Sequence, residues 1–68
     1  MTPADFRAAL ETLGWTVRGL ARMLGRPGGS VSNWTRDRYS VPPDVAAWLS
    51  RRVAEHRAMM RRDPPPRS

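Results

Sequence analysis

The sequence predicts an all-α fold, a small bundle of about four helices in which the last helix is long. Two observations support this prediction. Apolar residues recur at three- and four-residue spacing in four segments, which is the spacing of a helix that buries one face. Hydroxyl, proline and glycine residues stand where these segments begin and end, as expected of helix caps. The folded domain is predicted to cover residues 1–62, and residues 63–68 are expected to form a disordered Pro-rich tail.

The first predicted helix covers residues 2–13. Thr2 is a suitable N-cap, Pro3 suits the first helical position, and Asp5 can complete a capping box. The buried stripe of this helix is expected to contain Phe6, Ala9, Leu10 and Leu13. A glycine ends the helix, and Trp15, which follows it, is expected to pack over the junction with the next helix. The alternative is an exposed tryptophan that stacks on bases.

Two short helices are predicted on either side of a glycine-rich turn at residues 25–29. The first runs over residues 17–24, with Thr16 as its N-cap. Its inward face carries Val17, Leu20, Ala21 and Leu24. In the second, Val31 and Trp34 are three residues apart and point inward, so the two segments together predict a helix, a short turn and a second helix packed on the first.

The start of this third helix has two possible descriptions. Either Pro27 occupies its first turn, or the helix begins late with Ser30 as its N-cap. Gly28 and Gly29, which lie between these two residues, each destabilise a helix start by about 1 kcal/mol relative to alanine. The helix is expected to run to about Asp37. The glycine-rich turn lacks the Gly-Lys-Ser/Thr ending of a nucleotide-binding loop, so nucleotide hydrolysis is not expected.

The pattern Leu20-Ala21-x-x-Leu24-Gly25, followed after five residues by Val31-Ser32-x-Trp34, resembles the Cro/C1-type (XRE-like) helix-turn-helix repressors of bacteria and phages. The resemblance covers roughly residues 3–50. It implies a lambda-repressor-like fold and a homodimer that binds double-stranded DNA at an inverted repeat and represses transcription, often of its own gene in a phage or mobile element. The chain departs from the family at Val17, where a phosphate-binding Gln is usual, and at Gly28 and Gly29, where base-reading side chains are common.

Polar side chains on the outer faces of the third helix are expected to read DNA bases. Asparagine pairs bidentately with adenine, arginine pairs with guanine, and serine contacts either a base or a phosphate. The expected base-reading residues are Ser30, Ser32, Asn33 and Arg36. For the two serines, helix capping or simple solvent exposure is the alternative.

Phosphate contacts are expected from the second helix, the turn and the loop that follows the third helix. Arg18 and Arg22 are four residues apart on the helix that crosses the DNA backbone, and a solvated face is the alternative for both. The glycines of the turn allow close approach of the backbone to a phosphate. The expected phosphate-binding residues are Thr16, Arg18, Arg22, Arg26, Gly28, Gly29, Arg38 and Tyr39, of which the last two belong to a predicted loop at residues 37–43.

The last predicted helix begins at Pro43 or Asp44 and ends near Arg61. Its first apolar residues are expected to seal the core, and these are Val45, Trp48 and Leu49. The apolar stripe continues beyond what the core needs. A two-fold dimer interface is therefore expected at Leu49, Val53, His56, Met59 and Met60. The alternatives are a helix end that packs on its own domain, or a basic membrane-surface helix, which Glu55 and the short apolar face disfavour.

The composition favours an anionic partner. The net charge is +6, and all twelve basic residues are arginine, so nucleic acid is expected before a membrane surface. There is no cysteine, only one histidine and no apolar run near the ~20 residues of a membrane span. The N-terminus lacks the pattern of a signal peptide. These features lead us to expect a cytoplasmic, nucleoid-associated protein.

The sequence gives no indication of catalysis. The six acidic residues are scattered, and a chain of 68 residues has little room for a water-excluding pocket. We therefore expect a protein that is not an enzyme and that has no metal, cofactor or small-molecule ligand. The competing interpretation is a protein-binding adaptor or antitoxin that keeps the helix-turn-helix fold with weak or no base readout.

Overall fold

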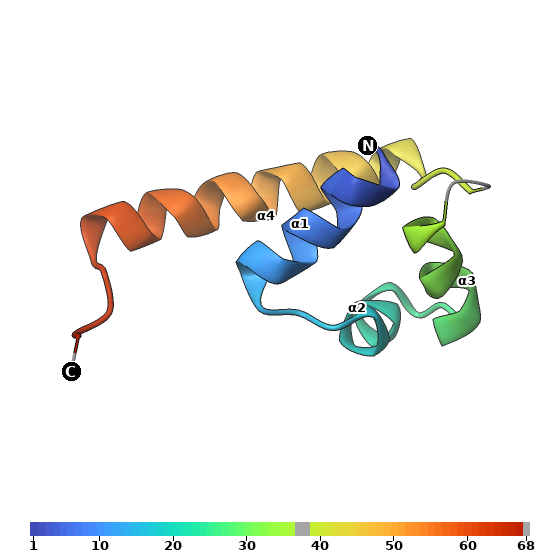
Figure 1. Cartoon of the computed structure of the whole chain (residues 1–68), viewed down its shortest axis with the longest axis horizontal. Helices are drawn as coiled ribbons and strands as arrows, with labels where there is room; N and C mark the ends of the chain where they lie inside the picture. Colours follow the sequence, from blue (N-terminus) through green and yellow to red (C-terminus); the bar gives the residue numbers. More distant parts are fainter. Residues whose placement is uncertain (37–38, 68) are drawn as a thin grey trace.

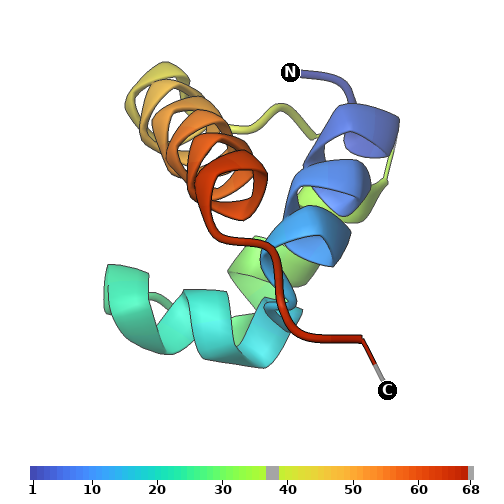
Figure 2. The ribbon, with the colours of Figure 1, turned by 90° about the vertical axis from the view of Figure 1, so that its left-hand side faces the viewer.

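The computed structural model describes residues 1–36 and 39–67, and the elements within them are all helical. They are α1 (Pro3–Leu13), α2 (Val17–Leu24), α3 (Gly28–Ser32), the 3₁₀-helix η1 (Asn33–Thr35) and α4 (Pro43–Arg62). The long α4 runs the length of the molecule, and α1 packs across it (Figure 1). Figure 2 shows α1 and α4 side by side above α2. The predicted all-α bundle with a long last helix is confirmed.

Side-chain caps and left-handed glycines define the ends of α1 and α2. The Thr2 hydroxyl accepts a hydrogen bond from the backbone N–H of Asp5 at 3.0 Å, and the Asp5 carboxylate accepts one from Thr2 N–H at 3.3 Å, which completes the predicted capping box. The Thr16 hydroxyl accepts from a backbone N–H one turn on, at 3.0 Å. Gly14 and Gly25 end the two helices with φ of 71° and 64°, a conformation that favours glycine.

Each α-helix contributes one fully buried side chain to the core. Phe6, Leu20, Val31 and Leu49 each have 0% relative exposure. Trp34 is also buried, and its ring meets that of Phe6 edge to face, with centroids 5.8 Å apart. The inward positions predicted for Val31 and Trp34 are therefore confirmed. This shared core fixes α3 against both α1 and α2.

A second aromatic pair lies at the border of this core. Trp15 and Trp48 are half-buried, and their ring centroids are 5.6 Å apart. Trp15 follows α1, and Trp48 belongs to α4, so the pair ties the α1–α2 junction to the last helix. Trp15 thus packs at the junction as expected, although it is not fully enclosed.

The third helix is shorter than predicted. It ends at Ser32, continues as the 3₁₀ turn η1, and reaches an extended backbone at Arg36 with φ −113° and ψ 149°. The prediction that the third helix runs to about Asp37 is therefore wrong, because the helical segment ends before Arg36. Asp37 itself lies outside the described residues. Tightening to 3₁₀ geometry is common at helix ends. Here the Thr35 hydroxyl donates to the Ser32 carbonyl at 2.7 Å, which supports the tighter turn.

The beginning of α3 decides between the two descriptions given above. Pro27 is the N-cap and Gly28 the first helical residue, so the proline stands one position before the first turn. Ser30 lies inside the helix, so the alternative in which it caps a late start is wrong. Because proline has no side-chain acceptor, this helix begins without a side-chain cap.

The N-terminal part of α4 seals the core, and its C-terminal half extends past the other helices (Figure 1). Val45 and Leu49 are buried, and Trp48 is half-buried. Leu49 therefore belongs to the core of its own domain, and its prediction as a dimer-interface residue is wrong. No helix in the described part of the chain has the length and apolar character needed to cross a membrane.

Candidate nucleic-acid interface

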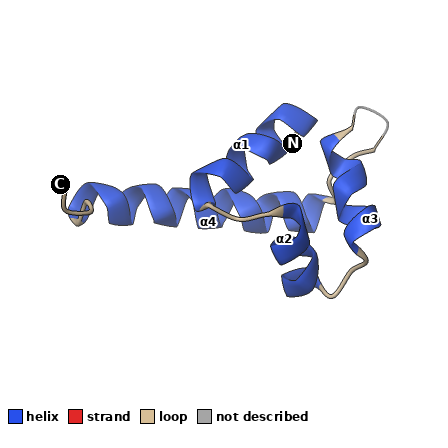
Figure 3. Cartoon of the chain, turned by 60° about the horizontal axis from the view of Figure 1, so that its bottom comes forward, coloured by secondary structure: helices blue, strands red, loops and turns tan. Residues whose placement is uncertain are grey.

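Positive charge is concentrated around α2 and α3. Residues 12–36 include four arginines and no acidic residue. The four are Arg18, Arg22, Arg26 and Arg36, and all are exposed. The helices α2 and α3 pack on each other at one end of the molecule (Figure 3). Arg18 and Arg22 belong to α2, Arg26 to the turn between the two helices, and Arg36 follows η1. The four charges thus belong to the helix-turn-helix segment and its immediate ends.

The polar edge of α3 and η1 carries the predicted base-reading residues. Ser30 is exposed, whereas Ser32 and Asn33 are half-buried and still accessible. Arg36 is exposed and follows the helical segment instead of belonging to it. The candidate interface is thus a short helix followed by a tight turn. Within residues 1–36 and 39–67, the side chains of Ser30 and Asn33 have no hydrogen-bond partner in the protein.

The end of this polar edge is held in place by a residue of α1. The Arg7 guanidinium donates a hydrogen bond of 2.7 Å to the Thr35 carbonyl, 28 residues away in the sequence. It thereby satisfies one of the carbonyl groups that a helix end leaves without a partner. Sequence analysis missed Arg7, because nothing in its local spacing indicates a contact with the third helix.

The turn arginine is oriented by the core. The Arg26 guanidinium lies over the Trp34 ring, 5.4 Å from its centroid, and Trp34 is itself fixed by the core. Such a cation–π contact contributes about 0.5–1 kcal/mol at an exposed site. It restricts the side chain of Arg26, which remains exposed. The spacing of eight residues between the two gave no sequence signal.

The other residues predicted to contact phosphate differ in how available their side chains are. Arg18 and Arg22 lie one turn apart on the exposed surface of α2, as expected. The Thr16 hydroxyl already accepts the N-cap hydrogen bond of α2, which limits what it can offer a ligand. Tyr39 is 47% exposed, and Arg38 lies outside the described residues.

The paired glycines leave the start of α3 open. A Cβ added at Gly28 or Gly29 would meet no atom within 4 Å, and neither residue has a positive φ. The packing and backbone of the protein therefore do not require glycine at these positions. The bare backbone can instead approach a large ligand more closely than a side chain would permit.

The dimer residues predicted on α4 lie beyond the core, with the exception of Leu49. Val53 and His56 are half-buried, and Met59 and Met60 are 45% and 36% exposed. Arginine is abundant here too, but Arg52 is engaged within the helix. Its guanidinium forms an ion pair with Glu55 at 3.0 Å and lies 5.8 Å from the centroid of the Trp48 ring.

The described residues contain no group of three histidine, aspartate or glutamate side chains that could hold a metal ion. Comparison of the chain with protein-family models, with curated proteins and with solved structures found no match in any of the three. The function is therefore inferred from the side chains and their arrangement.

Proposed function

We propose that this protein binds double-stranded DNA in a sequence-specific manner and represses transcription as a homodimer. The observation that carries the proposal is the polar edge of α3 and η1, which is bordered by four arginines in a stretch without an acidic residue. An arginine-rich segment without an acidic residue, folded around a short packed helix, suits a polyanion that has a groove. The motif resemblance described above points to the same class of protein.

In this proposal, α3 and η1 enter the major groove and read the bases. Asn33 pairs with adenine, and Arg36 pairs with guanine O6 and N7. Ser30 and Ser32 contact a base edge or a phosphate. The hydrogen bond from Arg7 and the core contacts of Trp34 support this function, because they fix the backbone from which the reading side chains project.

Arg18, Arg22 and Arg26 supply the phosphate contacts. Each phosphate that is neutralised adds about −0.9 to the slope of log affinity against log salt concentration. Three such contacts per subunit therefore give a steep loss of affinity as salt increases. The bare backbone at Gly28 and Gly29 and the exposed phenol of Tyr39 supply further contacts to the DNA backbone in this proposal.

We place the dimer interface on the C-terminal half of α4, which extends past the other helices and carries exposed apolar side chains (Figure 1). Helix-turn-helix dimers bind half-sites whose centres are about 34 Å apart, one turn of DNA, and we expect the same spacing here. The corresponding operator is an inverted repeat, and autoregulation in the cytoplasm, at the nucleoid, is the expected setting.

Selection of bound sequences from a random pool of duplex DNA tests the proposal. We expect a palindromic consensus. Two variants distinguish residues that recognise bases from residues that bind phosphates. Asn33→Ala should relax the base preference at one position per half-site, whereas Arg22→Ala should weaken binding to all sequences alike and lower the salt slope by about 1. If Arg22→Ala altered the consensus and Asn33→Ala did not, these roles would be wrong. A pool that yields no consensus would reject sequence-specific binding.

A second candidate is a protein-binding adaptor or antitoxin. It is favoured by the glycine pair, because Gly28 and Gly29 remove side chains from the first turn of α3, where helix-turn-helix proteins make base contacts. A gel shift with the promoter of the protein's own gene at low salt separates the two candidates. A specific complex supports the repressor, and its absence supports the adaptor.

A further inference from the structure

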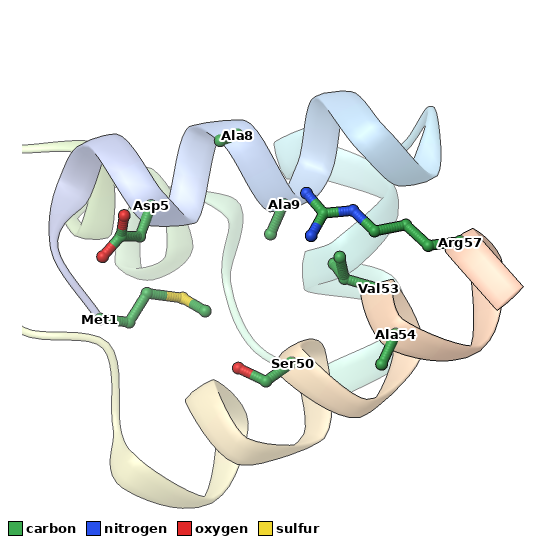
Figure 4. Close-up of a pocket in the computed structure, with 8 residues that line it drawn as sticks. All are labelled: Met1, Asp5, Ala8, Ala9, Ser50, Val53, Ala54 and Arg57. Carbon is green, nitrogen blue, oxygen red and sulfur yellow. The ribbon is translucent and has the colours of Figure 1, made fainter.

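Two hollows border the helix α4. One, of about 300 Å³, lies between α1 and α4, and its lining includes Ala9 of α1 and Val53 and Ala54 of α4 (Figure 4). The other, of about 400 Å³, lies between α2 and the N-terminal half of α4, and Met23 and Leu24 line it from α2. Outside the shared core, α4 therefore lacks close packing along part of each neighbouring helix.

A stack of three side chains lies where α4 meets the junction of α1 and α2. The Trp48 ring contacts the Trp15 ring, with centroids 5.6 Å apart and planes inclined by 32°. Arg52, one turn further along α4, lies 5.8 Å from the centroid of the Trp48 ring, and its ion pair with Glu55 at 3.0 Å holds it there. Aromatic pairs and arginine–aromatic pairs at such distances attract each other in preferred orientations, so the stack resists rotation of one helix against the other.

The backbone connects Trp15 to both of the helices beside it. Its N–H donates a hydrogen bond of 2.9 Å to the Leu10 carbonyl of α1, and the next residue, Thr16, is the N-cap of α2. Because α2 and α3 pack on each other, a rotation of α2 carries α3 with it. The stack therefore ties the start of the helix-turn-helix segment to α4.

We propose that the stack of Trp15, Trp48 and Arg52 fixes the angle between the helix-turn-helix segment and α4, and that it thereby sets the half-site spacing that the dimer recognises. The inference rests on the proposed function, in which α3 reads DNA and the C-terminal half of α4 forms the dimer interface. The helix α4 is continuous from Pro43 to Arg62, and its C-terminal end and α3 lie at opposite ends of a molecule 39 Å long (Figure 1). A change of angle at Trp48 would therefore move α3 relative to the two-fold axis.

This geometry matters because DNA spacing changes in discrete steps. One additional base pair between the half-sites displaces one of them by about 3.4 Å and rotates it by about 35°. A dimer with a fixed angle cannot follow both changes, whereas a dimer with a loose angle can. Trp48 thus determines specificity for spacing without touching a base.

Operators that differ only in the number of base pairs between their half-sites test this role. The wild-type chain should prefer one length. Trp48→Leu and Trp15→Leu should each bring the ratio of affinities for the preferred operator and for one a base pair longer toward one, with the half-site consensus unchanged. Because both remove the same contact, the double variant should resemble either single variant. Trp48→Phe keeps an aromatic ring and should retain most of the preference. A substitution that only destabilised the fold would lower both affinities equally and leave the ratio unchanged.

The angle itself can be measured without DNA. The chain has no cysteine, so Arg22→Cys in α2 and Ala54→Cys in α4, both at exposed positions, can carry spin labels. Double electron–electron resonance, with excess unlabelled chain so that only distances within one chain are measured, should give a broader distance distribution when Trp48→Leu is added. Arg52→Lys keeps the charge but loses the planar group, and it should broaden the distribution less. The matched control is Arg51→Lys on the exposed surface of α4, which should change nothing.

The outcomes separate this inference from the proposed function. A chain that selects a palindromic consensus but whose spacing preference or distance distribution is unchanged by Trp48→Leu keeps the repressor function and overturns the role of the stack. A wild-type chain that binds all spacings equally overturns it as well. A wild-type chain that selects no consensus overturns the repressor function and with it the role in spacing, and a distribution broadened by Trp48→Leu would then support only the fixed angle.

Discussion

The α2–α3 region and the helix α4 are both rich in arginine, but they organise it differently. Within residues 12–36 no acidic residue interrupts the positive charge along the sequence. The buried Trp34 ring orients the side chain of Arg26, and an exposed hydrogen bond from Arg7 holds the end of η1. In α4, five arginines alternate with Asp44, Glu55 and an apolar stripe, and Arg52 is paired within the helix. The same residue type therefore forms the proposed polyanion-binding surface in one region and flanks an apolar stripe in the other.

The largest effect is expected at the point where the apolar stripe of α4 passes from core to surface. Leu49→Ala should lower the free energy of unfolding by about 2–5 kcal/mol, because it leaves a cavity in the shared core. Denaturant titrations at low and high protein concentration should give the same loss. Met60→Ala should change stability only at concentrations where the dimer forms. A loss for Leu49→Ala that grew with protein concentration would return this residue to the dimer interface.

A smaller effect is expected where α1 holds the end of η1. Arg7→Ala should remove the hydrogen bond to the Thr35 carbonyl and cost about 1 kcal/mol, since the contact is exposed and charge-assisted. The backbone N–H of Arg36, which donates to the Asn33 carbonyl, should then exchange faster with solvent. DNA affinity should fall with it. The control is Arg51→Ala on the exposed surface of α4, and equal effects of the two substitutions would refute the positioning role.

The N-cap of α2 gives an effect of similar size at the other end of the proposed interface. Thr16→Ala should destabilise the protein by about 1 kcal/mol, because a backbone N–H loses its acceptor. Thr16→Ser should keep most of the stability, since it retains the hydroxyl. Thermal unfolding measures both. If the alanine variant kept its stability and lost only DNA affinity, the hydroxyl would serve mainly a phosphate.

The smallest change separates stability from DNA binding. Gly29→Ala should stabilise the fold by about 0.4–1 kcal/mol, because the added Cβ meets open space and the unfolded chain loses freedom. If the bare backbone is needed at the DNA, affinity should decrease while the melting temperature increases. Thr12→Ala, on a half-buried position of α1 away from the interface, is the control for affinity. Unchanged affinity in Gly29→Ala would show that the backbone does not approach DNA closely there.

Local signals predicted much of this fold. The capping residues of α1 and α2 act over three or four positions, so Thr2, Thr16, Gly14 and Gly25 could be assigned from spacing alone. The inward residues of α3 followed from the helical period in the same way. These features depend on neighbours along the chain, and the sequence contains those neighbours.

The errors arose where distant contacts decide the outcome. Periodicity placed Leu49 on the correct stripe but could not show how far α1 covers that stripe. The early change of α3 to a 3₁₀ turn depends on Thr35, whose carbonyl is bound by Arg7 from another helix. The stacking of Arg26 on Trp34 likewise joins residues that no local pattern relates.

The uncapped start of α3 has a consequence for its behaviour in solution. Pro27 offers no acceptor, and two glycines follow it, so this helix gains little from its own sequence and is held by Val31, Trp34 and the bond from Arg7. Its amide protons should therefore exchange before those of α1 and α4 as the protein is warmed. If α3 becomes fully ordered only when the protein binds its target, part of the binding free energy is used to order it. This lowers the affinity of the protein for the target without changing which target it prefers.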